Sequence, residues 1–144
     1  MENRTNEATF SIQTLEPGNP GSGADLSFTV PDKMRIQILA FEFQFATSGV
    51  AANRFLNVHG NDGTQDVIFN QAPTAQTASE TLFYHFIMGQ TFLHDATDGT
   101  NVIVNLSSGM FFEAGETVNT TIVNLSALDA ITAISLRCKV WITE

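Results

Sequence analysis

Residues 30–46, VPDKMRIQILAFEFQFA, are the stretch on which the fold prediction depends. From Met34 to Ile38 every second residue is apolar, which is the alternation of a strand buried on one face. From Leu39 the phase changes, and the apolar residues are now the odd-numbered ones, three of them phenylalanine. Because side chains alternate strictly along a strand, this change predicts a β-bulge or a crossing between two sheets. A run of about thirteen residues at roughly 3.3 Å each is long for one flat strand. We therefore expect a bent strand that serves both layers of a sandwich.

The rest of the chain has the pattern of short strands separated by turn residues. Further strands are expected at residues 8–15, 25–30, 54–60, 67–70, 80–88, 102–106, 117–125 and 131–143. Leu56 and Val58 are expected to point inward and Arg54 outward, and Asp62-Gly63 marks a hairpin turn. No segment of useful length has helical periodicity. Eight to ten short strands with turns about every ten residues predict an all-β fold, an antiparallel β-sandwich of jelly-roll-like type.

The chain is expected to form one sandwich domain with an N-terminal appendage. Residues 1–24 comprise a first strand and a flexible tether rich in Pro and Gly, and residues 25–144 form the β-sandwich domain. On such a tether the first strand either pairs within its own sheet or reaches a neighbouring subunit as an arm. Both possibilities are open at this point.

Composition excludes several classes of function. The net charge is −9, with six basic residues in 144, so a basic face for nucleic acid is not expected. No apolar run approaches the roughly 20 residues of a membrane helix, and the N-terminus has no secretion signal. We expect a soluble protein made in the cytoplasm. The single cysteine, Cys138, allows no internal disulfide, and its apolar surroundings favour a core position.

Candidate chemical sites are sparse, and no cofactor is expected. Oxygen ligands cluster at Asp62 and Asp66 and again at Asp95 and Asp98, but neither spacing matches a known calcium loop, and turn chemistry explains both clusters. The three histidines, which are not spaced as metal ligands, are His59, His85 and His94. No G-x-S-x-G nucleophile turn is present. We expect the protein not to be an enzyme.

Contact with another protein is the function that the remaining residues favour. Trp141 is expected on the outward face of the last strand, beside Arg137 and Lys139, where it contacts a partner, covers a sheet edge or packs under a loop. Phe10, Ile12 and Leu15 are the apolar residues of the N-terminal strand and would make its contacts.

Three segments, spread over residues 28–143, resemble small all-β proteins encoded among the head genes of tailed bacteriophages. They are Val30-Pro31 with Ile38-Leu39; the hairpin of Asn53-Arg54 and Asp62-Gly63 followed by residues 74–79; and Phe112, residues 114–118, Asn124-Leu125, Asp129 and Trp141-Ile142. The resemblance implies a virion structural protein of the head decoration (cement) type. It also implies a homo-oligomer, with a trimer favoured, that binds the major capsid protein on the outside of the capsid.

Other functions remain open at this stage. One is a receptor-binding or carbohydrate-binding sandwich of a phage tail, and another is a head–tail connector component. A hydrolase is the least favoured.

Overall fold

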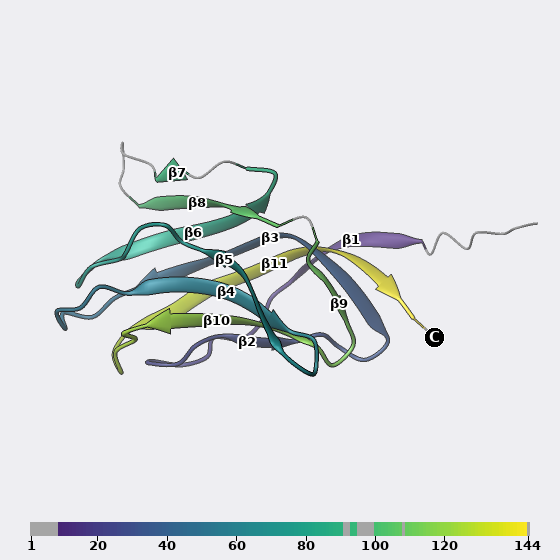
Figure 1. The fold of residues 1–144 in the computed structure, drawn as a ribbon, viewed down its shortest axis with the longest axis horizontal. Coiled ribbons are helices and arrows are strands. Elements are labelled where there is room, and N and C mark those ends of the chain that lie inside the picture. Colours follow the sequence, from purple (N-terminus) through teal and green to yellow (C-terminus); the bar gives the residue numbers. More distant parts are fainter. Residues whose placement is uncertain (1–8, 91–92, 95–99, 108, 144) are drawn as a thin grey trace, which may run out of the picture.

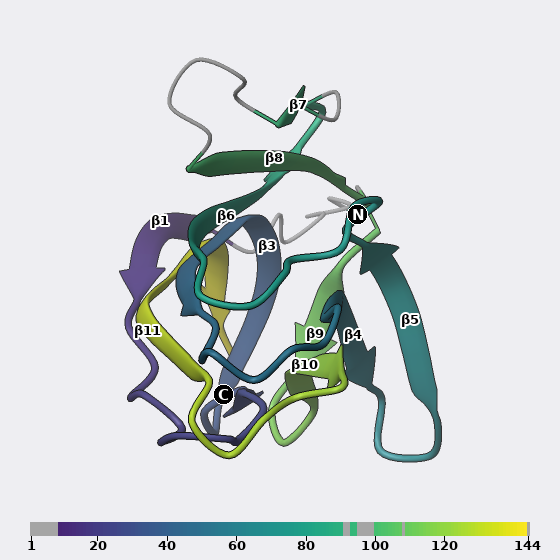
Figure 2. The same cartoon turned by 90° about the vertical axis from the view of Figure 1, so that its left-hand side faces the viewer.

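The computed structural model describes residues 9–90, 93–94, 100–107 and 109–143, and every regular element in them is a β-strand. Two sheets pack face to face with the hydrophobic core between them (Figures 1 and 2). The all-β sandwich predicted from the sequence is confirmed. In the described residues there is no helix of the length and hydropathy that crossing a membrane requires.

The two sheets differ in size. The larger has seven strands in the order β1-β11-β3-β6-β8-β7, with β9 paired to β3. Its strands are β1 (Phe10–Leu15), β3 (Met34–Ala46), β6 (Thr81–Met88), β7 (Leu93–His94), β8 (Asn101–Leu106), β9 (Phe111–Glu113) and β11 (Ala130–Ile142). The smaller sheet has the order β2-β10-β4-β5. Its strands are β2 (Ser27–Thr29), β4 (Phe55–Asn61), β5 (Asp66–Gln71) and β10 (Thr117–Val123).

Strand β3 organises the larger sheet, with β11 along one side and β9 and β6 along the other. Cys138 of β11 pairs with Ile38 and Arg137 pairs with Ala40, so Leu39 is the extra residue of a β-bulge. The predicted bulge is confirmed. The expected passage of this strand into the second layer is wrong, because the bulge restores the core-facing phase within one sheet.

The sandwich is not wholly antiparallel. Strand β6 lies between β3 and β8, as its two apolar faces indicate, but β6 and β8 run parallel. Twelve residues separate β6 from β8 in the sequence, which is about the length of connection that a parallel pair needs. A jelly roll has eight strands in two Greek keys. The seven- and four-stranded sheets seen here do not confirm that part of the prediction.

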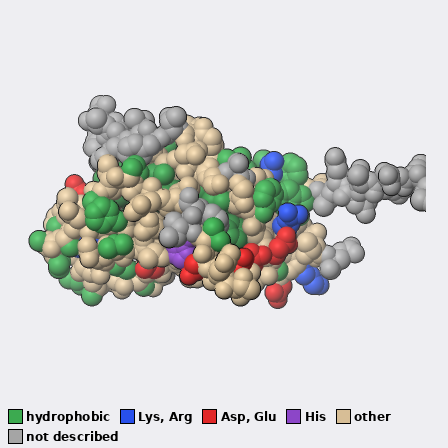
Figure 3. Space-filling model, in the orientation of Figure 1, with side chains coloured by type: hydrophobic (Ala, Val, Ile, Leu, Met, Phe, Trp, Pro, Cys, Tyr) green, Lys and Arg blue, Asp and Glu red, His purple; other side chains and the backbone are tan. Residues whose placement is uncertain are grey.

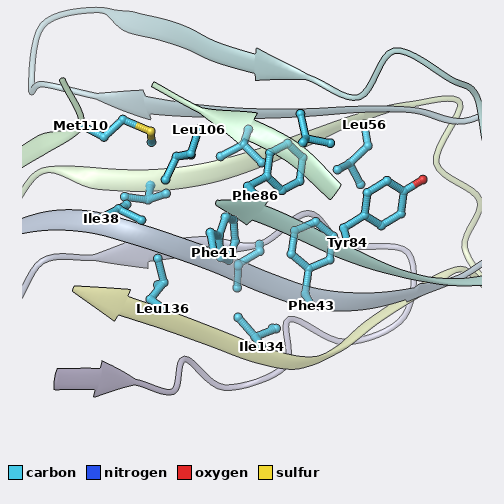
Figure 4. Close-up of a cluster of buried hydrophobic side chains, with 14 of the residues drawn as sticks. Ile38, Phe41, Phe43, Leu56, Tyr84, Phe86, Leu106, Met110, Ile134 and Leu136 are labelled. Carbon is cyan, nitrogen blue, oxygen red and sulfur yellow. The ribbon is translucent and has the colours of Figure 1, made fainter. Parts of the chain in front are cut away.

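Aromatic side chains of β3 and β6 fill the centre of the core (Figure 4). The rings of Phe43 and Tyr84 stack with centroids 5.6 Å apart, and Phe86 lies 6.1 Å from Phe43. Tyr84 is 2% exposed, and its hydroxyl donates a hydrogen bond to the side-chain oxygen of Gln76 at 3.0 Å. Burial, together with the charge of Glu80, raises the pKa of Tyr84, so the hydroxyl remains a donor at ordinary pH.

Arg54 is buried in the structure, with 1% of its surface exposed, so the prediction that it points outward is wrong. Its Nε donates to Asp129 Oδ2 at 3.0 Å, and its Nη2 donates to Asp129 Oδ1 at 3.1 Å. Nη1 donates to the carbonyls of Val50 and Ala52 at 2.9 and 2.7 Å. The physical reason for the error is that the partner carboxylate is distant in sequence and adjacent in space.

Asp129 completes this buried cluster at one end of the sandwich. Its carboxylate also accepts hydrogen bonds from the backbone N–H groups of Ser48 and Ser126, at 2.7 and 2.8 Å. The backbone of Arg54 pairs with that of Gln76 in both directions, at 2.9 Å. The ion pair therefore joins two loops, and the backbone of Arg54 joins the third, which contains Gln76.

The predicted tether ends at the same cluster. The Gly23 N–H donates to the carbonyl of Asp129 at 2.8 Å. Gly23 has a φ of +69°, and a Cβ atom there would lie 2.7 Å from the Cα of Ala127, so only glycine fits. Before the tether, β1 pairs with β11 of its own chain.

We expect Asp129→Ala to lower the free energy of unfolding by roughly 3–5 kcal/mol, because the guanidinium of Arg54 is left buried without its counter-charge. Chemical denaturation measures this loss. Burial alone would raise the pKa of Asp129, but hydrogen bonds from Ser48, Ser126 and Arg54 outweigh it and lower the pKa from 3.8 to about 2. Because the folded-state pKa is the lower one, this stabilisation is complete above the unfolded-state pKa of 3.8 and is lost as the pH falls through about 2.

The matched control is Asp32→Ala, which removes an exposed carboxylate from the turn before β3. We expect it to change stability by less than about 0.5 kcal/mol and to keep the acid-induced loss. Equal losses in the two variants, or an unchanged acid profile in Asp129→Ala, would contradict the assigned role of the ion pair.

Candidate protein-binding face

One end of the outer face of the larger sheet gathers aromatic and basic side chains. Residues opposite one another in antiparallel strands project from the same face. One cross-strand row contains Phe10, Trp141, Arg35 and Glu113, and the next contains Ile12, Lys139, Gln37 and Phe111. We define the aromatic-basic face as Phe10, Ile12, Arg35, Phe111, Lys139 and Trp141.

The side chains of this face contact one another in a fixed arrangement. The ring of Trp141 lies between those of Phe10 and Phe111, with centroid distances of 5.6 and 6.1 Å. The guanidinium of Arg35 lies over Phe111 and Trp141, at 5.2 and 5.8 Å, and the Lys139 ammonium lies 4.7 Å from the Phe10 ring centroid. Each cation–π contact at an exposed site stabilises the arrangement by about 0.5–1 kcal/mol. The face is therefore organised before anything binds to it.

Much apolar surface remains open to solvent on this face. Ile12, Phe10 and Phe111 are 53%, 46% and 43% exposed. Arg35 also forms an ion pair with Glu113 at 3.1 Å, with both side chains about half exposed. Clustered apolar side chains with polar groups at their rim are typical of protein contact sites.

Basic residues are concentrated here in a chain whose net charge is −9. Of the five basic residues in the described ranges, Arg54 is buried in the ion pair with Asp129. The other four are Lys33 in the turn before β3, Arg35 on β3, and Arg137 and Lys139 on β11. In Figure 3 the blue side chains lie at the right-hand end, next to green hydrophobic ones.

Four of the five contact residues expected from the sequence lie on one surface. Phe10, Ile12 and Trp141 belong to the aromatic-basic face, and Arg137 lies one row further along the same side of the sheet. Leu15 differs, because it is half buried on the inner side of β1 and packs against the core. Leu15 therefore attaches β1 to its own domain.

Two members of the face were not expected from the sequence. Arg35 was assigned only as the polar residue between two apolar ones, and Phe111 stood in a short turn-flanked run with Phe112. Their meeting depends on the pairing of β9 with the start of β3, which links residues far apart in the chain. No local signal in the sequence marks that pairing.

The oxygen-rich clusters show ordinary turn chemistry where the structure describes them. Asp62 Oδ1 accepts hydrogen bonds from the backbone of Gln65 and from the backbone and hydroxyl of Thr64, and these bonds lower the pKa of Asp62. Asp66 Oδ1 accepts a hydrogen bond from Asn61 at 2.9 Å. The second cluster, Asp95 and Asp98, lies outside the described residues. Within those residues no group of three or more His, Cys, Asp or Glu side chains is placed to hold a metal ion.

The histidines occupy three separate places. His85 lies on the outer face of the larger sheet, with Nδ1 3.1 Å from Glu42 Oε2 and Nε2 2.9 Å from Asn101 Oδ1. His59 lies on the smaller sheet, in β4, and His94 lies in β7 rather than in the expected loop. The structure brings none of them to the aromatic-basic face.

No known protein family matches the chain, and no curated protein matches it in sequence.

Cys138 is fully buried in the core, and burial raises the pKa of its thiol to about 12. Since the thiolate is the reactive form, we expect no reaction with a thiol reagent at pH 8 in the native protein. Reaction should reach one thiol per chain after unfolding in guanidinium chloride. Rapid labelling of the native protein would contradict the buried position.

We also expect Phe10 and Trp141 to stabilise the fold jointly. A double-mutant cycle with Phe10→Ala and Trp141→Ala, measured by chemical denaturation, should give a coupling of about 0.5–1.5 kcal/mol from the ring contact. The control cycle pairs Trp141→Ala with Phe83→Ala, an exposed aromatic at the other end of the same sheet face. Its effects should add within about 0.5 kcal/mol. Additivity in both cycles would show that the rings do not interact.

Proposed function

We propose that the protein is a virion structural protein of the head decoration (cement) type. In this role it binds the outside of an assembled phage capsid through the major capsid protein and stabilises contacts between capsomers. The observation that carries the proposal is the exposed aromatic-basic face on an otherwise acidic protein. The proposed role of the protein is to bind another protein, and no chemical step is assigned to it.

The composition of the face supports a role in binding protein. Trp and Arg are among the residues that contribute most to protein–protein affinity, and aromatic residues are enriched at interface cores. Trp141 is half buried at the centre of the face, with Arg35 above it and exposed Phe10 and Phe111 on either side. This is the arrangement of an anchor surrounded by residues that exclude water.

The rigidity of the face favours strong attachment. All six residues lie on hydrogen-bonded strands, and the side chains of all but Ile12 form ring or cation–π contacts with one another. Less conformational entropy is lost on binding when contact residues are ordered in advance. A capsid protein performing a mechanical role needs this property more than adaptability.

The charge of the face specifies the complementary surface. Lys139 and Arg137 present positive charge, whereas the charge of Arg35 is balanced by Glu113, and the protein as a whole is strongly acidic. A partner surface carrying carboxylates would be attracted to this end and repelled elsewhere, which orients the docking. We infer that the contacted capsid surface is acidic with an apolar centre.

The resemblance to phage head proteins is the basis for proposing a homotrimer. A trimer would place three such faces around one axis, so that one molecule contacts several capsomers. Binding only the assembled shell stabilises that shell by mass action. We therefore propose that the chain acts on the capsid surface of the virion as a homotrimer.

The test is binding to assembled heads of the phage that encodes the chain. Purified protein should co-sediment with the heads, and Trp141→Ala or Lys139→Glu should weaken binding roughly tenfold or more. Static light scattering of the free protein should give a mass near three times 15.7 kDa.

The control is Phe83→Ala, which removes an aromatic of similar exposure from the other end of the sheet face. It should bind heads as the unchanged protein does. A monomeric protein with no affinity for heads, or equal weakening by Phe83→Ala and Trp141→Ala, would overturn the proposal.

A further inference from the structure

A second surface feature lies on the outer face of the smaller sheet, on the opposite side of the sandwich from the aromatic-basic face (Figure 2). It is a pocket of about 180 Å³ lined by Asn57, His59, Asp66 and Thr121. Strands β4, β5 and β10 each contribute to it. The proposed decoration function uses none of these residues.

Strand register brings the lining residues together. Asn57 of β4 lies opposite Thr121 of β10, and two residues further along β4 is His59. Asp66, the first residue of β5, pairs with Asn61 at the other end of β4. Alternate residues of β4 and β10, Asn57, His59 and Thr121 among them, face outward, while those between them face the core.

Internal hydrogen bonds hold the pocket in one shape. His59 Nε2 lies 2.5 Å from the Thr121 hydroxyl, and Asn57 Nδ2 donates to the Thr121 carbonyl at 3.3 Å. Asn61 Nδ2 donates to Asp66 Oδ1 at 2.9 Å. A small-molecule site needs such fixed polar groups in a concave surface, and here they are in place before any ligand arrives.

Unused hydrogen-bonding groups in the pocket indicate what would bind there. Asn57 Oδ1 and Asp66 Oδ2 accept no hydrogen bond from the described residues. His59 Nδ1 is buried, has no hydrogen-bond partner in that part of the chain, and lies 3.8 Å from Asp66 Oδ1. A ligand that donates hydrogen bonds would satisfy the two side-chain oxygens. His59 Nδ1 donates or accepts according to the tautomer of the ring.

The charge and the volume of the pocket further restrict the chemical class and the size of the ligand. Asp66 and the net charge of −9 disfavour phosphates and other anions. Most of the surface that lines the pocket is apolar. Phe55 and Val123, which pair in the next outward row and are 38% and 46% exposed, extend this apolar surface beyond the lining residues. The volume is below the roughly 300–1,000 Å³ of sites for drug-sized molecules, so the occupant is small.

We propose that this pocket binds a single ring of a neutral saccharide. A sugar ring combines hydroxyl donors along its edge with an apolar C–H face. The hydroxyls meet Asn57 and Asp66, and the C–H face lies against the apolar part of the pocket lining. A protein attached to a shell through the aromatic-basic face would present this pocket outward, toward solvent.

Binding fits the pocket better than hydrolysis. Thr121, His59 and Asp66 occur in the order of a nucleophile, a base and an orienting acid. The 3.8 Å separation of Asp66 and His59 is too long for the hydrogen bond that would orient the base. The backbone N–H that follows Thr121, that of Ile122, already donates to Asp25 at 3.0 Å and is not free for an oxyanion.

The experiment is an array of immobilised neutral, anionic and cationic glycans probed with the full-length protein. Each positive is then titrated in solution as its methyl glycoside, with binding followed by NMR chemical shifts. The protein should bind at least one neutral sugar, and Asp66→Ala and Asn57→Ala should each weaken binding at least tenfold. Asp66 is 61% exposed, so its substitution should leave the fold intact, which a thermal melt checks.

The matched control is Glu42→Ala, which removes the carboxylate beside His85 on the opposite face and should leave sugar binding unchanged. Absence of binding to every neutral glycan would overturn the proposal. Binding of charged glycans alone, or binding that survives both pocket substitutions, would overturn it equally. None of these outcomes depends on binding to phage heads.

Discussion

The buried ion pair of Arg54 and Asp129 is the interaction on which the geometry of the sandwich depends. Both side chains are fully removed from solvent, so each charge is costly unless all its hydrogen-bonding capacity is used. The guanidinium donates two hydrogen bonds to the carboxylate and two more to backbone carbonyls. The carboxylate also accepts hydrogen bonds from two backbone N–H groups. The three loops that meet there connect β3 to β4, β5 to β6 and β10 to β11. The ion pair thereby holds the two sheets in position at one end of the core.

Fixing the two sheets also fixes two chemically different outer surfaces. The larger sheet presents aromatic rings under cations, which suits a protein partner that can cover apolar surface. The smaller sheet presents amides, a histidine and a carboxylate around a small hollow, which suits a hydrogen-bonding ligand. Because the surfaces lie on opposite sides of the core, one can be occupied while the other remains open. A single small domain with this arrangement could bind a protein through the larger sheet and a small ligand through the smaller sheet.

The sequence predicted what depends on local alternation and turn chemistry. The phase change at Leu39, the hairpin at Asp62-Gly63 and the alternation of β11 from Ile134 to Val140 are properties of neighbouring residues, and each is confirmed. The expectation that Ile142 continues this alternation inward is wrong, because Ile142 is 64% exposed at the end of the strand. Arg54 was misplaced because its partner is 75 residues away and no periodicity records a charge inside a core. The parallel pairing of β6 with β8 was missed for the same reason. The aromatic-basic face was half predicted, since Trp141 and β1 were identified, whereas Phe111 reaches it only through pairing across the sheet.

Strand β1 connects the packing argument to the proposed role. It is the terminal strand of the larger sheet in the part of the chain that the structure describes, so the backbone groups on its outer side have no strand partner there. Its outward side chains, Phe10 and Ile12, are apolar and about half exposed. An apolar edge strand is a site of association in a free protein, and soluble monomers usually blunt such edges with charge or proline. Lys139 over Phe10 supplies one charge, but it lies on the face and leaves the edge itself open. Strand β1 therefore has an open backbone edge and an apolar outer face, and both favour contact with another protein. This combination is expected of a protein that is most stable when a partner covers β1.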